Sequence, residues 1–395
     1  MQDPELELKE NILQTVSQCM NCRFCLPSCP LFEITEDSVS GGASGIIRAL
    51  YWMLKWDETD RSTLTELRDV LYSCTTCRNC ELACATLSTG VKLVDAIETG
   101  RKWLIEKMIG PMPEQKSLLE HSERYGNPYG MLPADRKEWM KGLGVAQFSA
   151  ADGHELLFYV GCTAPHDPVV GNMARAIVKV LQRAGVSFGI TEDEFCCGSP
   201  SRRVGESFLF DDLSRKNVEQ FKELGVKHIV TLSPHCYNSY LNEYPTDEMA
   251  DIKVQHYTQF LAELLEAGRL VLSNGLDRKV TYHDPCYLGR HNEVYEAPRK
   301  VISAIPGMKF VEFERCRENS LCCGGGGGRM WSDFEAEQDR MANIRVRDAL
   351  ALGVDTIVTA CPFCLINIVD GIKSVNADDR IVCKDLAELV LESIA

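Results

Sequence analysis

Two cysteine runs near the start of the chain restrict its fold more than any other feature. Residues 19–30 read CMNCRFCLPSCP and residues 74–85 read CTTCRNCELACA, so each run has the spacing Cys-x2-Cys-x2-Cys-x3-Cys. In ferredoxins this run holds a [4Fe-4S] cluster with three cysteines, and the fourth ligates the other cluster. We therefore predict one cluster on Cys19, Cys22, Cys25 and Cys84. The second is predicted on Cys74, Cys77, Cys80 and Cys29. Zinc is the alternative occupant.

The segments around these runs have the apolar spacing of helices. Residues 44–56, 62–74 and 93–109 each repeat apolar side chains at three- and four-residue intervals, and Ser62 or Thr63 is a candidate cap for the second. Compact ferredoxins use short hairpins at this place, so a helical ferredoxin unit is predicted. Residues 110–145 are rich in proline and glycine, which predicts an extended linker or docking segment.

From about residue 154 short apolar runs alternate with helical stretches, which predicts βαβ units with parallel sheets. This part is duplicated. Cys162 corresponds to Cys286, the Cys-Cys-Gly at 196 to that at 322, and Cys236 to Cys361, each about 125 residues apart. Because these cysteines follow apolar strand-like runs, we expect them to cluster at the carboxyl ends of the strands.

The two copies differ in their cysteines. The second copy has five, Cys286, Cys322, Cys323, Cys361 and Cys364. The first has four, Cys162, Cys196, Cys197 and Cys236, and Ser239 is interpreted as replacing the last one. Five thiolates exceed the need of one tetrahedral metal or one cubane, so the second copy is expected to hold a bridging cysteine or a cluster of unusual geometry.

Residues 321–330, LCCGGGGGRM, combine adjacent cysteines with five glycines. A phosphate-binding loop would continue with Gly-Lys-Ser/Thr, which is absent, and a disulfide between adjacent cysteines is strained. Metal ligation remains, with glycines that let backbone amides approach sulfur. Arg329 is a candidate for contacting an anionic group of a substrate, or else a solvated or partner-facing arginine.

The order of these motifs resembles the D subunit of heterodisulfide reductase and the wider cysteine-rich "CCG" iron–sulfur family, and is also similar to the iron–sulfur subunits of glycolate, lactate and glycerol-3-phosphate oxidising complexes. The resemblance implies an α-helical ferredoxin domain followed by two tandem α/β, Rossmann-like CCG domains. The expected boundaries are 1–108 for the ferredoxin domain, 109–153 for the linker, and 154–272 and 273–395 for the two CCG domains.

By the same resemblance, the five cysteines of the second copy would hold a noncubane [4Fe-4S] cluster that cleaves the disulfide of coenzymes M and B by binding each sulfur to iron. The catalytic subunit of that family has two complete motifs, whereas the first is broken here. The first copy is therefore expected to hold a four-cysteine cluster, a zinc ion or nothing.

Composition restricts the partners. The net charge of −15 disfavours nucleic acid and anionic lipid, and no stretch approaches the length of a membrane span. The start of the chain lacks a signal peptide, so a cytoplasmic protein is predicted, associated with membranes only through another subunit. The expected function is an electron-transferring oxidoreductase subunit for thiol/disulfide chemistry, which receives electrons from a flavoprotein or a b-type cytochrome membrane subunit. The alternatives are a non-catalytic electron carrier in a flavoprotein dehydrogenase complex and a zinc-binding scaffold.

Several single residues outside the cysteine sets are further candidates. His283 is a candidate proton donor or a structural histidine at a strand end, and His235 is a candidate additional ligand in the first copy. Cys316 and Cys383 are interpreted as ordinary buried thiols. Trp52, Trp56 and Trp103 are expected to pack between helices.

Overall fold

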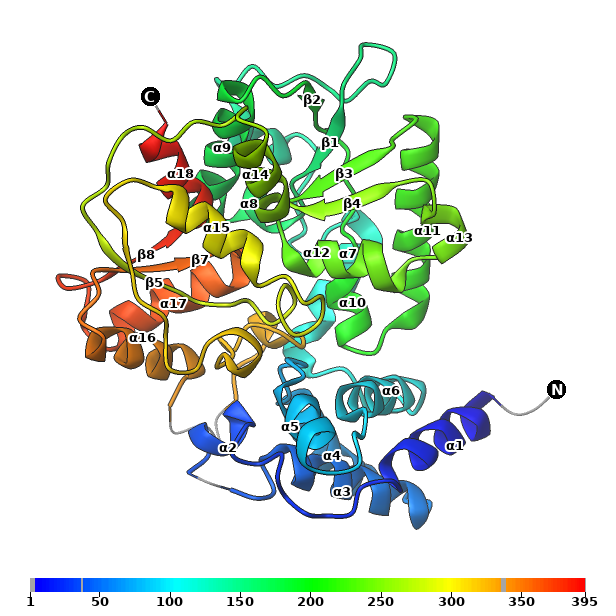
Figure 1. Cartoon of the computed structure of the whole chain (residues 1–395). Coiled ribbons are helices and arrows are strands. Elements are labelled where there is room, and N and C mark those ends of the chain that lie inside the picture. The colour runs from blue at the N-terminus through cyan, green and yellow to red at the C-terminus, as the bar shows by residue number, and fades with distance from the viewer. Residues whose placement is uncertain (1–3, 37, 335–338, 395) are drawn as a thin grey trace.

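The computed structural model describes residues 4–36, 38–334 and 339–394, and its first part is entirely helical. Figure 1 shows these helices, coloured blue to cyan, as a separate layer against the α/β part of the chain. They are α1 (Pro4–Val16), α2 (Pro30–Ile34), α3 (Ala43–Lys55), α4 (Arg61–Tyr72), α5 (Asn79–Leu87) and α6 (Leu93–Glu106). The helical ferredoxin-type unit expected from the sequence is therefore present.

Local sequence explains where these helices begin. The N-cap of α4 is Asp60, whose carboxylate accepts a hydrogen bond from the Thr63 backbone amide at 2.9 Å. The predicted cap at Ser62 or Thr63 is thus wrong by two or three residues, because an aspartate in extended conformation precedes them. Helices α3, α4 and α6 bury their apolar faces against one another, and Trp103 is buried as expected. Trp52 and Trp56 instead stack on each other, and both are exposed.

The segment between the helical part and the first strand is more ordered than a linker. It contains α7 (Lys116–Tyr125), which ends at Gly126 in the left-handed conformation. This helix packs against α10 (Ser199–Arg203) and α11 (Ser207–Glu223) of the following unit. The segment is therefore docked against the α/β part of the chain.

Two α/β units, here called copy one and copy two, follow the docked segment. Copy one runs from β1 to α14 and copy two from β5 to α18. The other elements of copy one are β1 (Leu156–Tyr159), α8 (Thr163–His166), α9 (Pro168–Arg183), β2 (Phe188–Gly189), β3 (His228–Thr231), α12 (Pro234–Asn238), α13 (Thr246–Met249), β4 (Lys253–His256) and α14 (Tyr257–Glu266). Copy two contains β5 (Lys279–Tyr282), α15 (Glu296–Ala304), β6 (Lys309–Phe310), α16 (Met341–Ala351), β7 (Thr356–Thr359), α17 (Pro362–Ser374), β8 (Val382–Asp385) and α18 (Leu386–Ser393).

Each copy forms a four-stranded parallel sheet. The strand orders are β2-β1-β3-β4 and β6-β5-β7-β8, so the second sheet repeats the topology of the first. The register is also comparable, with Leu157 opposite Ile229 in one sheet and Val280 opposite Thr356 in the other. All four residues of β1 are buried, as expected for a central parallel strand with both faces covered. The predicted parallel-sheet α/β architecture is thus observed.

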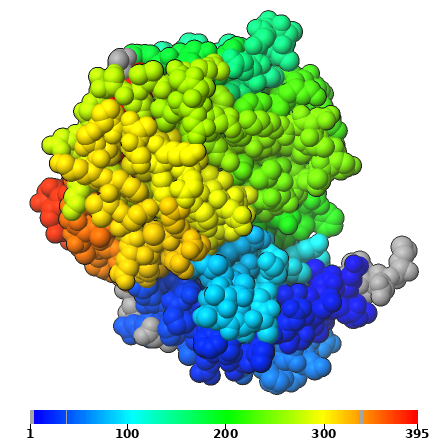
Figure 2. All heavy atoms as spheres, in the orientation of Figure 1, coloured from blue at the N-terminus to red at the C-terminus, as the bar shows by residue number. Residues whose placement is uncertain are grey.

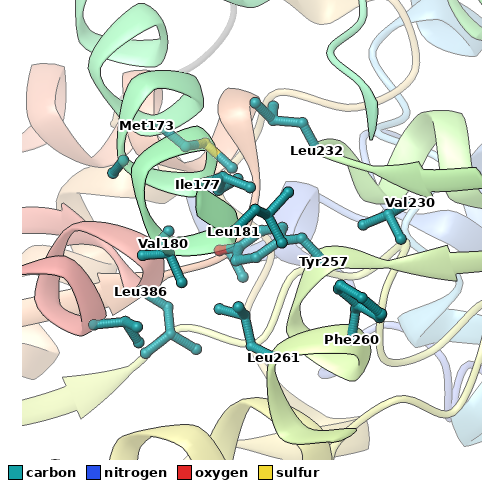
Figure 3. Packing of buried hydrophobic residues seen from close by; sticks show 14 of the residues in the cluster. Met173, Ile177, Val180, Leu181, Val230, Leu232, Tyr257, Phe260, Leu261 and Leu386 are labelled. Atoms are coloured by element: carbon teal, nitrogen blue, oxygen red, sulfur yellow. The ribbon is translucent and has the colours of Figure 1, made fainter. Parts of the chain in front are cut away.

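The two copies share one hydrophobic core. Helix α9 of copy one packs on α18 of copy two, and α14 of copy one packs on α15 of copy two, so the first long helix of each copy meets the last helix of the other. Figure 3 shows Met173, Ile177 and Leu181 of α9 meeting Leu261 of α14 and Leu386 of α18. Burial of this common core fixes the two sheets relative to each other.

In the space-filling view the helical part lies directly against the α/β units, without a separating linker (Figure 2). No helix among the described residues is long and apolar enough to cross a membrane.

Candidate metal centres

The first cysteine-lined cavity lies in the helical part, between the loop after α1 and helix α5. Its cysteines are Cys19, Cys22, Cys25 and Cys84, and its empty volume is about 340 Å³. Cys22 is exposed, and its sulfur lies 3.3 Å from the Ser88 hydroxyl oxygen. Burial, together with the neighbouring thiols of Cys29 and Cys19, raises the pKa of Cys25 to about 12. A thiol of this kind loses its proton when a metal ion binds and replaces it.

The second cavity, of about 330 Å³, lies beside the first. Its cysteines are Cys29, Cys74, Cys77 and Cys80. Burial raises the pKa of Cys29 to about 11 and that of Cys74 to about 12. Each cavity therefore combines three cysteines of one run with the fourth cysteine of the other, which is the grouping that crossed ligation requires.

Helix α5 explains how the runs cross. Cys80 and Cys84 stand one helical turn apart on it, and each contributes to a different cavity. Cys29, at the N-cap of α2, makes the reciprocal crossing.

The loops of both cysteine runs have the same unusual backbone. Asn21 and Arg23 in the first run have φ of 56° and 66°, and Thr76 and Arg78 in the second have 54° and 63°. Positive φ costs non-glycine residues on the order of 1 kcal/mol each, and such strain gathers at functional sites. Backbone amides also point at sulfur, because Thr76 N donates to Cys74 Sγ and Val91 N to Cys84 Sγ, both at 3.3 Å.

The five cysteines of copy two come together as one buried group. Cys286 follows β5 and Cys361 and Cys364 follow β7, so three of them lie at the carboxyl ends of strands. The neighbouring Cys286 thiol lowers the pKa of Cys322. The thiols of Cys322 and Cys364 lie in hydrogen-bond contact with Cys323 and hold its pKa well below the usual range.

Copy two lies directly against the second cavity of the helical part. The Cys77 thiol is in hydrogen-bond contact with Cys322, which raises the pKa of Cys77 well above its usual value. The two cysteine sets are thus continuous through a sulfur–sulfur contact.

The four cysteines of copy one form a second buried group. Cys196 Sγ lies 3.8 Å from Cys162 Sγ, and Cys197 is in hydrogen-bond contact with Cys196 and Cys236. A cavity of about 470 Å³ opens between this group and copy two. Its lining includes Cys162, Cys197, Cys236, Ser233, His235, residues 325–328, Trp331 and Phe363.

The missing cysteine of copy one is Ser233, not Ser239. Strand β3 ends at Thr231 and helix α12 has Ser233 as its N-cap, whereas β7 ends at Thr359 and α17 has Cys361 as its N-cap. Ser233 therefore occupies the position of Cys361, and Cys236 that of Cys364. Ser239 lies outside the cavity, fully buried, with its hydroxyl donating to Glu243 Oε2 at 3.0 Å. The interpretation of Ser239 as the replaced cysteine is wrong, because the shared offset of about 125 residues does not hold across this strand and helix.

The glycine run serves a close contact between the helical part and copy two. A Cβ at Gly326 would lie 2.3 Å from the Thr75 carbonyl oxygen, and one at Gly327 would lie 2.2 Å from that of Cys74. The expected amide–sulfur contact also exists, because Gly324 N donates to Cys322 Sγ at 3.4 Å. Arg329 donates to the Ser73 and Gly324 carbonyl oxygens, so it connects the two parts of the chain.

Two arginines that were not predicted from the sequence complete this contact; Arg101 is buried and Arg290 is partly buried. Arg101 is 0% exposed and donates to the carbonyl oxygens of Leu71, Cys74, Arg203 and Gly327. Arg290 donates through Nε to the Cys77 carbonyl oxygen at 2.7 Å. In the sequence both arginines look like ordinary solvated residues, because their partners are backbone atoms far away in the chain.

The two candidate histidines are both buried. His283 at the end of β5 is 0% exposed, and burial lowers its pKa to about 3. His235 stacks near the rings of Tyr287 and Phe363, and burial lowers its pKa to about 3 as well. Neither histidine is therefore charged near neutral pH.

The family comparisons agree with this arrangement. The description "4Fe-4S dicluster domain" matches residues 15–87, and "Cysteine-rich domain" matches residues 156–239 and 280–369. A helical dicluster unit joined to two cysteine-rich α/β units defines an iron–sulfur protein of the electron-transferring type.

Full-length similarity identifies the family. The D subunit of the dihydromethanophenazine:CoB–CoM heterodisulfide reductase of Methanosarcina barkeri is 33% identical over 97% of this chain and 95% of its own length. The chain therefore belongs to the family of the heterodisulfide reductase D subunit.

Two longer relatives are also similar. The probable iron-sulfur-binding oxidoreductase FadF of Bacillus subtilis is 38% identical, and the EtfAB:quinone oxidoreductase of Syntrophomonas wolfei is 37% identical, each over 82% of this chain. The chain spans about half the length of these two relatives, 46% and 47%. Among solved structures, a hypothetical protein from Helicobacter pylori shares the fold, with a TM-score of 0.52 and 11% identity over 100% of this chain and 73% of its own.

Proposed function

We propose that this chain is the iron–sulfur subunit of an oxidoreductase complex and carries electrons from a partner protein to the five-cysteine site of copy two. The observation that carries this proposal is the continuity of three cysteine sets. Cys25 of the first cavity neighbours Cys29 of the second, and Cys77 of the second contacts Cys322 of copy two. A linear series of sites in contact is what stepwise electron transfer requires.

The donor sets support iron–sulfur clusters at these places. Each cavity of the helical part offers four thiols, which suits a [4Fe-4S] cubane, and copy two offers five, which suits a noncubane cluster with a bridging cysteine. When bound, such clusters accept and release single electrons. Around them the chain supplies the buried thiols, the amide donors and the close packing of residues 326–327 on the Cys74 loop.

The exposure of the cysteines supports electron transfer from the first cavity towards copy two. Cys22 is exposed, whereas the cysteines of the second cavity and of copy two are buried. Met20 and Phe24, on either side of Cys22, are 74% and 51% exposed. An electron-donating partner, either a flavoprotein or a b-type cytochrome membrane subunit, would therefore contact the first cavity.

For the terminal step we propose reduction of a disulfide at copy two. The reaction consumes two electrons and two protons and yields two thiols, so two electrons must arrive one after the other along the series. Cys323 lines a cleft of about 960 Å³, which gives a small substrate access to this site. The M. barkeri relative is named for the CoB–CoM heterodisulfide, which makes small disulfides the first substrates to test.

A second candidate function is electron transfer without substrate chemistry, within a complex linked to an electron-transferring flavoprotein. Ser233 at the position of Cys361 favours it, because copy one then lacks a complete five-cysteine set. The similarity to FadF and to the EtfAB:quinone oxidoreductase points in the same direction.

Two measurements on anaerobically purified protein test these proposals. Iron analysis should give about twelve irons per chain for three four-iron clusters, or about sixteen if copy one is also occupied. Zinc without iron would contradict both functions. Adding the CoB–CoM heterodisulfide or oxidised glutathione should change the EPR or Mössbauer spectrum of the copy-two cluster if disulfide chemistry occurs there. An unchanged spectrum, together with reduction of the clusters by a reduced electron-transferring flavoprotein, would support the second function.

A further inference from the structure

Two buried nitrogen donors belong to side chains that lie near the cysteines of copy two, and both lack a hydrogen-bond partner. They are His283 Nε2 and Arg290 Nη2, and neither has a partner among the described residues. A buried N–H group without a partner costs about 1–3 kcal/mol, so a pair of them around one site indicates a missing acceptor.

The hydrogen bonds of His283 fix which nitrogen carries the proton. Arg345 Nε lies 3.3 Å from His283 Nδ1, and a guanidinium can only donate, so Nδ1 is the acceptor. A neutral imidazole with Nδ1 unprotonated carries its hydrogen on Nε2. A ring nitrogen of His283 and the sulfurs of Cys323 and Cys364 lie within 4.8 Å of one another. Since Nδ1 is engaged by Arg345, the ring nitrogen that remains for these sulfurs is Nε2, which carries the hydrogen.

Arg290 occupies the opposite end of the cysteine group. Its Nε donates to the Cys77 carbonyl oxygen, and its Nη1 donates to the carbonyl oxygens of Ser320 and Glu318. The charges of Cys77, Cys286 and Cys322 act on its guanidinium, which places the cation between the second cavity and copy two. Within the described part of the chain, no carboxylate forms an ion pair with Arg290.

We propose that His283 and Arg290 are positioning residues that donate N–H hydrogen bonds to sulfur of the copy-two cluster and thereby make its reduction easier. This inference rests on the proposed function, because it requires a cluster on the five cysteines. Reduction adds one electron and hence negative charge, which N–H donors and a nearby cation stabilise, and such hydrogen bonds raise the potential of an iron–sulfur cluster. The protons stay on the two nitrogens, and only the electron moves.

The two donors favour electron transfer along the cysteine sites towards copy two. Arg290 lies where the second cavity meets copy two, and His283 lies on the far side, next to Cys323 and Cys364. An electron on copy two is stabilised from both ends, whereas no such pair of unpartnered donors faces the first cavity among the described residues. Electrons would therefore collect on copy two.

The test is an EPR-monitored redox titration of the full chain, with iron analysis of every sample. His283→Phe keeps an aromatic ring and removes the donor, and Arg290→Gln removes the cation. Each variant should lower the midpoint potential of the copy-two cluster. A tenfold loss in its reduced-to-oxidised ratio at fixed ambient potential corresponds to 59 mV. His256→Phe is the matched control, because His256 is also fully buried but has partners on both ring nitrogens. It should leave this potential unchanged.

The outcomes separate the inference from the proposed function. If the wild-type chain lacks a copy-two cluster, the proposed function fails, and the inference fails with it. If the cluster is present and both variants keep the wild-type potential, only the inference is overturned. If a variant fails to load iron, the role of His283 is tested on the wild-type protein instead. ENDOR spectra are recorded there for exchangeable protons and for ¹⁵N-labelled histidine. An exchangeable proton and a histidine nitrogen coupled to the copy-two cluster are expected, and their absence would overturn the role of His283.

Discussion

The Cys77 thiol is in hydrogen-bond contact with the Cys322 sulfur, although one belongs to the helical part and the other to copy two. This contact exists because the glycine run packs on the Cys74–Thr75 backbone and because Arg101 binds carbonyl oxygens from both sides. Two cysteine sets on different folding units are thereby brought next to each other. The arrangement makes the series of sites sensitive to substitutions far from any cysteine.

The crossed cysteine sets predict which cluster is lost when a fourth cysteine is replaced. Cys29→Ser should remove the cluster beside copy two, and Cys84→Ser the cluster near the exposed Cys22. Each should lower the iron content by up to about four atoms. Only Cys29→Ser should slow the electron-spin relaxation of the copy-two cluster, because its paramagnetic neighbour disappears. If Cys84→Ser slowed this relaxation and Cys29→Ser did not, each cysteine run would ligate its own cluster.

Gly327 should not tolerate alanine. A Cβ there would meet the Cys74 carbonyl oxygen at 2.2 Å, and the residue has φ of 65°. Gly144 has nearly the same φ, 63°, but a Cβ at that residue would have nothing within 4 Å. Gly144→Ala should therefore cost about 1 kcal/mol from backbone strain alone, and Gly327→Ala about 1–3 kcal/mol more from the clash.

Anaerobic urea unfolding of both glycine variants measures this difference directly. Equal losses in the free energy of unfolding would mean that the glycine run does not press on the cysteine loop. Iron content should be measured alongside, because displacement of the Cys74 loop is expected to weaken cluster retention in Gly327→Ala only.

Among residues without a direct role in metal binding, Arg101 is the one whose substitution is expected to destabilise the fold most. Arg101→Met removes hydrogen bonds to four buried carbonyl oxygens, of Leu71, Cys74, Arg203 and Gly327. The cost should be about 3 kcal/mol or more in the free energy of unfolding. Lys102→Met, at the neighbouring and more accessible position, should cost less than about 0.5 kcal/mol. Similar losses for the two variants in urea unfolding would disprove the role assigned to Arg101.

Because His256 is buried, we expect the free energy of unfolding to decrease in acid. Burial lowers its pKa to about 3, whereas an unfolded chain would bind the proton near pH 6.5. Above that pH the folded and unfolded states are both neutral at this residue, so stability does not change. As the pH falls below 6.5 only the unfolded state takes up the proton, and stability decreases by up to about 1.4 kcal/mol per pH unit.

Thermal unfolding between pH 8 and pH 5.5 tests this effect. His256→Gln should show a shallower decline below pH 6.5 than the wild-type chain, with a constant difference between the two above pH 7. Parallel profiles across the whole range would show that His256 does not contribute to acid sensitivity.

Much of the fold could be predicted because it depends on local patterns. The helical first part follows from apolar spacing, and the two parallel sheets follow from alternating short strands and helices. The grouping of cysteines into cavities follows from spacing rules known for ferredoxins. The contacts of Arg101, Arg290 and Gly327 could not be predicted, because each depends on a backbone carbonyl that only the folded chain brings near.

The position of the missing cysteine in copy one also becomes evident only from the ends of the strands and helices. Ser233 and Cys361 are both N-cap residues directly after a central strand, so they correspond in the fold. Ser233→Cys should complete five cysteines in copy one, and the chain should gain a cluster spectrum like that of copy two. Ser239→Cys should change neither iron content nor spectrum, because Ser239 lies outside the cavity and bonds to Glu243. If Ser239→Cys, and not Ser233→Cys, altered the Mössbauer spectrum, the correspondence drawn from the strand and helix ends would be refuted.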